Sequence, residues 1–270
     1  MTPRNKKKVL QAGNILAVIA TIIINTIAVV LPLNGKTTQE LSDAYPNLFV
    51  PAGLTFSIWG IIYVLLIVFA LYQARDLFKK EEIPMSFLSQ ITFLFIVSSI
   101  ANMAWIFCWH YEQVGLSLLV MIILLFSLLG IYVRLHIGRS TVPMNEKLCV
   151  HVPFSVYLGW ITVATIANVT AFLVCVSWDG FGLSELTWTI LVISVGTLIT
   201  LLMLIMRKDI AYSLVVLWAV LGIYIKRTTS PDTNPDVATT ALAAMVIILL
   251  GMFTSIVYQI YTRKTRKKIQ

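Results

Sequence analysis

The chain has 270 residues, of which 59% are hydrophobic and 12% are charged, and its formal net charge is +8 at pH 7. Soluble domains carry about 25% charged residues on average, whereas the mean hydropathy of this chain is +0.89. The composition therefore excludes an ordinary soluble domain and indicates an integral membrane protein, with the lipid bilayer as its first partner.

Eight stretches are apolar over a length that suits a transmembrane helix, which takes about 20 residues. In chain order they are residues 9–33, 54–73, 86–109, 114–133, 150–176, 186–206, 210–225 and 237–261. We therefore expect an all-α integral membrane protein, a bundle of about eight transmembrane helices.

The basic residues support this helix count. If the N-terminus is cytoplasmic, all Lys and Arg residues except Lys36, Lys226 and Arg227 lie in segments on the cytoplasmic side. Because Lys and Arg in short loops set the orientation of membrane helices, both termini are predicted to be cytoplasmic, in a plasma membrane of the bacterial inner-membrane type. Contact with anionic lipid then accounts for the positive charge, and no nucleic-acid partner is needed.

Ionisable side chains are missing from the middle of all eight stretches. Ion-coupled transporters and proton relays usually keep such a group inside the membrane, and acid–base catalysis requires one. The three cysteines have no metal-site or redox spacing. The sequence thus argues against a proton-coupled pump, a hydrolase and a metal centre; it leaves an enzyme open but favours a protein that is not one.

Amide and aromatic side chains recur at helical spacing in four of the stretches. With a rise of 1.5 Å per residue, Asn25, Trp59, Asn102, Trp105 and Asn168 all fall in the outer half of the bilayer. Such a layer suits the wall of a small-molecule cavity that opens outward. The four sets are Asn14, Val18, Thr21 and Asn25; Phe56, Trp59 and Tyr63; Ser98, Asn102, Trp105 and Trp109; and Tyr157, Trp160, Ala164 and Asn168.

These residues also have structural interpretations. A buried Asn often does no more than link two membrane helices, so Asn102 and Asn168 could link helices, line a cavity, or do both. Trp and Tyr also form belts at membrane interfaces, which is the interpretation we favour for Trp109, Trp178 and Trp188.

The stretch VHVPFSVYLGWITVATIANVTAFLV (150–174) resembles the fifth helix of the TspO/MBR family, the translocator or tryptophan-rich sensory proteins. In that family the helix carries a proline, an aromatic residue, a tryptophan, an alanine and an asparagine in this order. The matching residues here are Pro153, Tyr157, Trp160, Ala164 and Asn168.

Two further stretches are similar to motifs of the same family, and the resemblance covers residues 9–176 in all. It implies two parts: a five-helix TspO-like core at 1–176, and three added helices with a basic tail at 177–270. The stretches are ANMAWIFCWHYEQVGLSLLVMIILL (101–125), which matches at Asn102, Trp105 and Gly115, and VPAGLTFSIWGIIYVLL (50–66), which matches at Pro51, Trp59 and Tyr63.

The resemblance implies a cavity beneath the first loop, residues 34–53, that binds porphyrins or other hydrophobic molecules, including sterol-like ones. We therefore expect a receptor or sensor with a tetrapyrrole as a possible ligand and no covalent cofactor. The alternatives are a transporter of such molecules, a tetrapyrrole-degrading enzyme and a purely structural partner, and a homo-oligomer remains open. The expected ligand-binding residues are Asn25, Trp59, Tyr63, Asn102, Trp105, Tyr157, Trp160 and Asn168, with Tyr45, Pro46, Asn47 and Pro51 in a lid loop.

Overall fold

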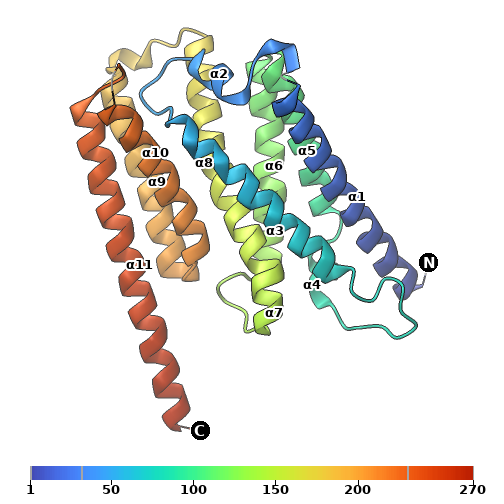
Figure 1. Cartoon of the computed structure of the whole chain (residues 1–270). Helices are drawn as coiled ribbons and strands as arrows, with labels where there is room; N and C mark the ends of the chain where they lie inside the picture. Colours follow the sequence, from blue (N-terminus) through green and yellow to red (C-terminus); the bar gives the residue numbers. More distant parts are fainter. Residues whose placement is uncertain (1, 32, 230, 270) are drawn as a thin grey trace. The chain divides into compact units, whose positions relative to one another are not determined.

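The computed structural model describes residues 2–31, 33–229 and 231–269, and this part of the chain contains helices but no strand (Figure 1). The expected all-α membrane bundle is confirmed. The α-helices are α1 Pro3–Val30, α2 Thr38–Asp43, α3 Ile58–Gln73, α4 Ser86–Ile91, α5 Leu94–His110, α6 Val114–Arg134, α7 Met144–Glu146, α8 Val152–Cys175, α9 Glu185–Arg207, α10 Ile210–Thr228 and α11 Pro235–Ile269. Between them lie 3-10 helices at Leu33–Gly35, Gly53–Ser57 and Gly180–Gly182 and a π-helical turn at Lys147–His151.

The chain forms two compact units. The first unit consists of Met1–Asn47 and Phe56–Trp178, and the second consists of Leu48–Thr55 and Asp179–Gln270. A short piece of the first loop thus belongs with helices that lie far along the sequence. No spacing or motif in the sequence indicates this grouping.

Helices α1, α3, α5, α6 and α8 build the first unit. Helix α5 packs on α1 and α6, α6 packs on α8, and α3 packs on α1 and α8 (Figure 1). Three fully buried rings, Phe69, Phe95 and Phe154, meet edge to face with centroids 5.0 to 5.8 Å apart. Because one ring comes from each of α3, α5 and α8, this triad fixes the spacing of the helices that carry most of the expected site.

Helices α9, α10 and α11 build most of the second unit and lie side by side. Gly251 lets α11 approach α9 closely, since a Cβ at this position would lie 2.9 Å from Leu201 Cδ2 and 3.1 Å from Leu204 Cδ1. Small residues at helix contacts are typical of membrane proteins because they allow backbones to approach.

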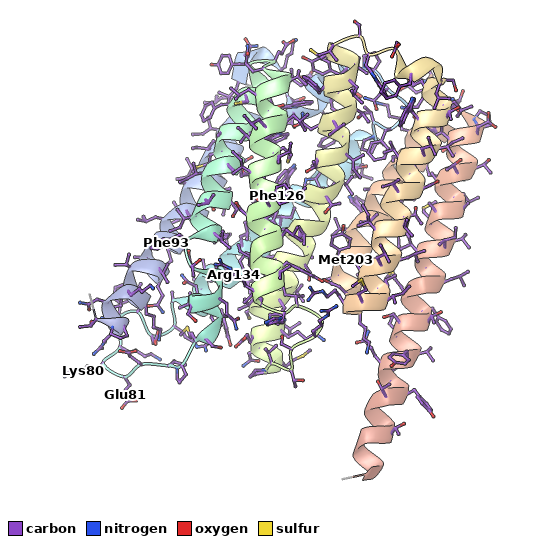
Figure 2. All side chains as sticks on the ribbon, turned by 180° about the vertical axis from the view of Figure 1, so that it is seen from behind. Lys80, Glu81, Phe93, Phe126, Arg134 and Met203 are labelled. Atoms are coloured by element: carbon purple, nitrogen blue, oxygen red, sulfur yellow. The ribbon has the colours of Figure 1, made fainter. Side chains whose placement is uncertain are left out.

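Seven helical segments of the described chain are long and apolar enough to cross a membrane, and α5, with 17 residues, is a shorter apolar helix. The prediction of one continuous helix at 86–109 is wrong. The chain breaks between α4 and α5, where Thr92 has a φ of 52°, a backbone conformation that cannot continue a right-handed helix. Arg134 Nη1 donates to Thr92 Oγ1 at 3.2 Å, next to Phe93 (Figure 2).

The outer surfaces of the helices suit a bilayer. Phe93 and Phe126 are 53% and 64% exposed (Figure 2), and most of the other exposed large side chains on the long helices are aliphatic. Such surfaces would associate in water, whereas lipid tails solvate them, so the chain is an integral membrane protein.

A buried carboxylate ties the start of α1 to the loop that follows α3. Asp76 is 5% exposed and accepts hydrogen bonds from Lys7 Nζ at 2.5 Å, Gln11 Nε2 at 2.7 Å and the Ile83 amide at 2.7 Å. Burial by itself would raise the pKa of Asp76, but these donors outweigh burial and lower the pKa from 3.8 to about 2.

The substitution Asp76→Asn should lower the free energy of unfolding by about 1 to 3 kcal/mol at pH 7, because hydrogen bonds to a charged group are lost. A carboxyl whose pKa is lowered by folding stabilises the protein above its unfolded pKa, and this contribution disappears as the pH falls through the folded pKa. The difference between wild type and variant should therefore shrink from pH 4 toward pH 2.

Thermal unfolding of the detergent-solubilised protein over this pH range is the measurement. Glu81→Gln is the matched control, since Glu81 is an exposed acid in the same loop (Figure 2). Equal losses in both variants, or a difference that persists unchanged at pH 2, would contradict the assignment.

Candidate functional site

Four aromatic side chains of the first unit gather around Trp59 of α3, and we call the five residues together the Trp59 cluster. The ring centroid of Trp59 lies 5.7 Å from Tyr63, 6.3 Å from Trp105, 6.2 Å from Tyr157 and 6.1 Å from Trp160. Tyr63 and Trp105 lie nearly parallel to Trp59, while Tyr157 and Trp160 meet it edge-on. The structure thus brings together all five aromatic residues that the sequence places in the site.

Helical spacing explains why these rings meet. Trp59 and Tyr63 are four residues apart on α3, and Tyr157 and Trp160 are three apart on α8, so each pair shares a helix face. Phe56 was expected on the same helix face as Trp59, but it lies in the 3-10 helix before α3. Its ring still meets Trp160 edge to face at 6.2 Å, so Phe56 extends the cluster.

The stack of rings continues toward the first loop. Trp105 lies parallel to Trp109 at 5.9 Å, and Trp109 meets Tyr45 at 5.9 Å. Trp109 is only 6% exposed, and its indole N–H donates to the Thr38 carbonyl at 3.4 Å. The interfacial-belt interpretation is therefore wrong for Trp109, because the ring is buried beneath α2 and the residues that follow it.

The expected lid loop is divided between the two units. Tyr45, Pro46 and Asn47 belong to the first unit, whereas Pro51 belongs to the second. Asn47 Nδ2 donates to the Tyr45 carbonyl at 2.9 Å and so closes a tight turn around Pro46. Of these residues, Tyr45 is the one whose ring joins the aromatic stack.

The three expected amides form two links between helices. Asn25 Nδ2 donates to Asn102 Oδ1 at 2.8 Å, which joins α1 to α5. Asn168 accepts from Trp105 Nε1 at 2.9 Å and donates to Ser117 Oγ at 3.0 Å, which joins α8 to α5 and α6. Sequence reasoning missed Ser117, because a serine in an apolar helix usually bonds only its own backbone, and nothing in its spacing marks it as a partner of Asn168.

Two buried N–H donors beside these links have no hydrogen-bond partner within the described part of the chain: Asn102 Nδ2 and Trp160 Nε1. Asn102 is 0% and Trp160 3% exposed. Trp160 belongs to the Trp59 cluster, and Asn102 lies three residues before Trp105 of that cluster on α5, so the two share a helix face. A buried unpaired donor costs on the order of 1 to 3 kcal/mol, so a molecule that brings acceptor atoms to the cluster would recover that free energy.

The chemistry of this site is stacking and hydrogen bonding. Its aromatic rings offer apolar faces, and its amides, indole N–H groups and phenols offer donors and acceptors. Trp59 and Tyr63 are half-buried, whereas the other members of the cluster are buried. The half-buried edge of the cluster is therefore the part that can meet a molecule without unfolding of the unit.

Comparison with known proteins identifies the family. A family model described as TSPO-like protein matches residues 9–254, so the chain belongs to the TSPO-like family, and the resemblance found in its helix motifs is confirmed. The match runs past residue 176 through α9 and α10 and into α11. No curated protein and no solved structure matches the chain.

We expect Asn168→Leu to lower the free energy of unfolding by about 1 to 3 kcal/mol, because the Trp105 indole N–H loses its buried acceptor. Unfolding by SDS of the protein in mixed micelles measures this. Thr165→Val on the same helix is the matched control, since Thr165 Oγ1 bonds the Ile161 carbonyl of its own helix.

A double-mutant cycle with Trp105→Phe tests whether the hydrogen bond between Trp105 and Asn168 is the cause of this loss of stability. The Trp105→Phe variant already lacks the indole donor. In this variant, Asn168→Leu should therefore lower the free energy of unfolding by less than it does in wild type. An equal cost in both backgrounds would show that the link between Trp105 and Asn168 does not stabilise the bundle.

Proposed function

We propose that this TSPO-like membrane protein is a receptor or sensor that binds a flat, mostly apolar small molecule at the Trp59 cluster, and that its ligand is of the tetrapyrrole class. One observation carries the proposal: the unpaired donors Trp160 Nε1 and Asn102 Nδ2 lie at a cluster of stacked rings whose central residue, Trp59, is half-buried. Donors and aromatic faces at one place suit a ligand that combines an aromatic body with acceptor atoms.

Porphyrins have this combination. The macrocycle is a flat aromatic body, and the carboxylates of its side chains are strong hydrogen-bond acceptors. Large aromatic side chains bury about 150 to 250 Å² each, so a few rings of the cluster can cover much of one macrocycle face. A sterol-like molecule would use the same apolar surface but offers a single hydroxyl, which would leave one of the two donors unpaired.

The side chains of the cluster favour binding over acid–base catalysis. Indoles, phenols and amides do not exchange protons readily near neutral pH, whereas a general acid or base needs a pKa near the working pH. An enzyme that degrades the bound tetrapyrrole would instead have to use an indole ring as a redox group. Product formation by the purified protein distinguishes this alternative from a receptor.

Titration of the purified protein with protoporphyrin IX, followed by tryptophan fluorescence, tests the proposal. Wild type should show saturable quenching, and Trp160→Phe should weaken binding about tenfold, because about 1.4 kcal/mol is lost with one hydrogen bond to an acceptor. Trp188→Phe is the matched control, since Trp188 lies on α9 and its indole donates to the Gly180 carbonyl.

Two results would overturn the proposed function. Quenching that rises linearly without saturation would mean that the porphyrin only partitions into the detergent or the protein surface. Equal affinities for wild type, Trp160→Phe and Trp188→Phe would mean that the cluster is packing and that the molecule binds elsewhere.

A second candidate, transport of the same class of molecule, is favoured by the polar face of α1. Gln11, Asn14, Thr21 and Asn25 are 1%, 0%, 2% and 6% exposed, so a polar face is buried along most of this helix. Asn14 Oδ1 and Thr21 Oγ1 have no hydrogen-bond partner among the described residues. Hydrogen-bonding groups that continue along the bundle beyond the Trp59 cluster suit a path for a polar ligand group.

Movement of protoporphyrin IX into sealed proteoliposomes separates the two candidates. If the protein transports, Asn14→Leu should slow the flux severalfold while the affinity at the Trp59 cluster stays unchanged, because Asn14 is not part of that cluster. Val18→Leu, a change of an apolar neighbour on the same helix, is the control. Saturable binding without flux above that of empty vesicles would leave the receptor as the function and exclude the transporter.

A further inference from the structure

The segment Leu48–Thr55, which we call the strap, is held by α9 and α10 of its own unit through its main chain. The Leu48 amide donates to Glu185 Oε1 at 2.6 Å, and the Leu48 carbonyl accepts from Arg227 Nε at 3.1 Å. Further along the strap, the Ala52 amide donates to the Gly222 carbonyl at 2.9 Å. At its end, Trp218 Nε1 donates to the Thr55 carbonyl at 3.0 Å.

Gly222 of α10 makes this close approach possible. A Cβ at position 222 would overlap the Thr55 hydroxyl and would lie 3.0 Å from Thr55 Cβ and 3.1 Å from Pro51 Cβ. Any other residue would therefore push the strap away from the helix, and the bond from the Ala52 amide to the Gly222 carbonyl would lengthen. Glycine in the middle of a helix is unfavourable for the helix itself, so close contact with the strap is the physical reason for its presence here.

The strap is also buried, which makes its release costly. Phe49, Val50 and Thr55 are 6%, 5% and 1% exposed. Arg227 is 6% exposed, and besides the strap it bonds the Asp232 carbonyl at 3.2 Å. A buried guanidinium must keep its hydrogen bonds because it cannot lose its proton, so Arg227 is a firm anchor for the carbonyl of Leu48.

Both ends of the strap lead directly to residues of the proposed site. Tyr45, whose ring meets Trp109, precedes the start of the strap by three residues, and Phe56, whose ring meets Trp160, follows the strap immediately. Four residues after the end of the strap the chain reaches Trp59. A displacement of the strap is therefore transmitted through the covalent chain to the first loop on one side and to the start of α3 on the other.

We infer that the helices of the second unit act as an anchor for the first loop, and that the bonds between the strap and α10 set how fast a ligand enters and leaves the Trp59 cluster. This inference rests on the proposed function, since it assigns a regulation to the same site. It also gives α9 and α10 a defined role, because opening of the loop requires the strap to leave Gly222, Trp218 and Arg227.

Two measurements on the full-length protein test the inference. Hydrogen–deuterium exchange reports release of the strap through the amide of Ala52, which its bond to Gly222 protects. Stopped-flow fluorescence reports the dissociation rate of protoporphyrin IX. Gly222→Ala should speed exchange in the strap about tenfold and raise the dissociation rate severalfold, with a smaller change in affinity because entry also becomes faster.

Gly196→Ala is the matched control. Gly196 is a helical glycine of α9, and a Cβ there meets nothing within 4 Å. Alanine favours a helix over glycine at either position, so neither variant should unfold its helix. Gly196→Ala should leave both strap exchange and ligand dissociation unchanged.

Two more variants test whether the effects of Gly222→Ala arise from the lost contact between the strap and α10. Trp218→Phe removes the donor to the Thr55 carbonyl without adding volume, and it should change both rates in the same direction as Gly222→Ala. Adding Thr55→Ala to Gly222→Ala removes the hydroxyl that the new methyl group would overlap, and it should return both rates toward wild type.

The outcomes separate this inference from the proposed function. Faster strap exchange with an unchanged ligand dissociation rate would overturn the inference and leave the binding proposal standing. If the hydrogen–deuterium exchange rate of the strap is unchanged in both Gly222→Ala and Trp218→Phe, α10 does not anchor the strap, and the inference is overturned. Absence of saturable porphyrin binding to wild type would overturn the proposed function, and the control of ligand access with it, while strap exchange would still report the anchor itself.

Discussion

Inside a bilayer no water is available to satisfy a polar group, and every other feature of this protein depends on that constraint. Helices satisfy their own main chain, which explains why an apolar chain of this kind becomes a helical bundle. Polar side chains must instead find partners on other helices, as Asn25 does with Asn102 and Asn168 does with Trp105 and Ser117. The strap is not a regular helix over its whole length, and α9 and α10 bond the amide and carbonyl of Leu48, the amide of Ala52 and the carbonyl of Thr55.

Some buried side chains of the first unit are exceptions to this pairing among the described residues, and two of them lie at the Trp59 cluster. Trp160 Nε1 and Asn102 Nδ2 are buried donors without a partner in the described chain, although neighbouring amides of the same bundle are paired. A bundle selected only for stability would gain by pairing or replacing them, since an unsatisfied buried donor costs on the order of 1 to 3 kcal/mol. Their position at the stacked rings around Trp59 is the reason why we propose that an acceptor-bearing ligand binds there.

Much of this site could be predicted from the sequence because helix geometry is local. Spacings of three and four residues place Trp59 with Tyr63 and Tyr157 with Trp160 whatever surrounds them. The same reasoning failed where the local geometry changes: Thr92 breaks the expected third helix, and Phe56 lies in a 3-10 helix rather than on α3. It also failed for Trp109, because the end of a helix suggests an interface, whereas α2 and Tyr45 cover this ring.

By itself the sequence determined the membrane class, the approximate positions of the long helices, the helix faces that carry amides and aromatic rings, and the family. All of these follow from composition, from a period of 3.6 residues and from motifs within single helices. Only the tertiary structure decided which amide pairs with which donor, which donors stay unpaired, and that the strap lies against Gly222. These contacts join residues far apart in the chain, such as Thr55 and Trp218, and such pairs are set by how the helices pack rather than by any local spacing.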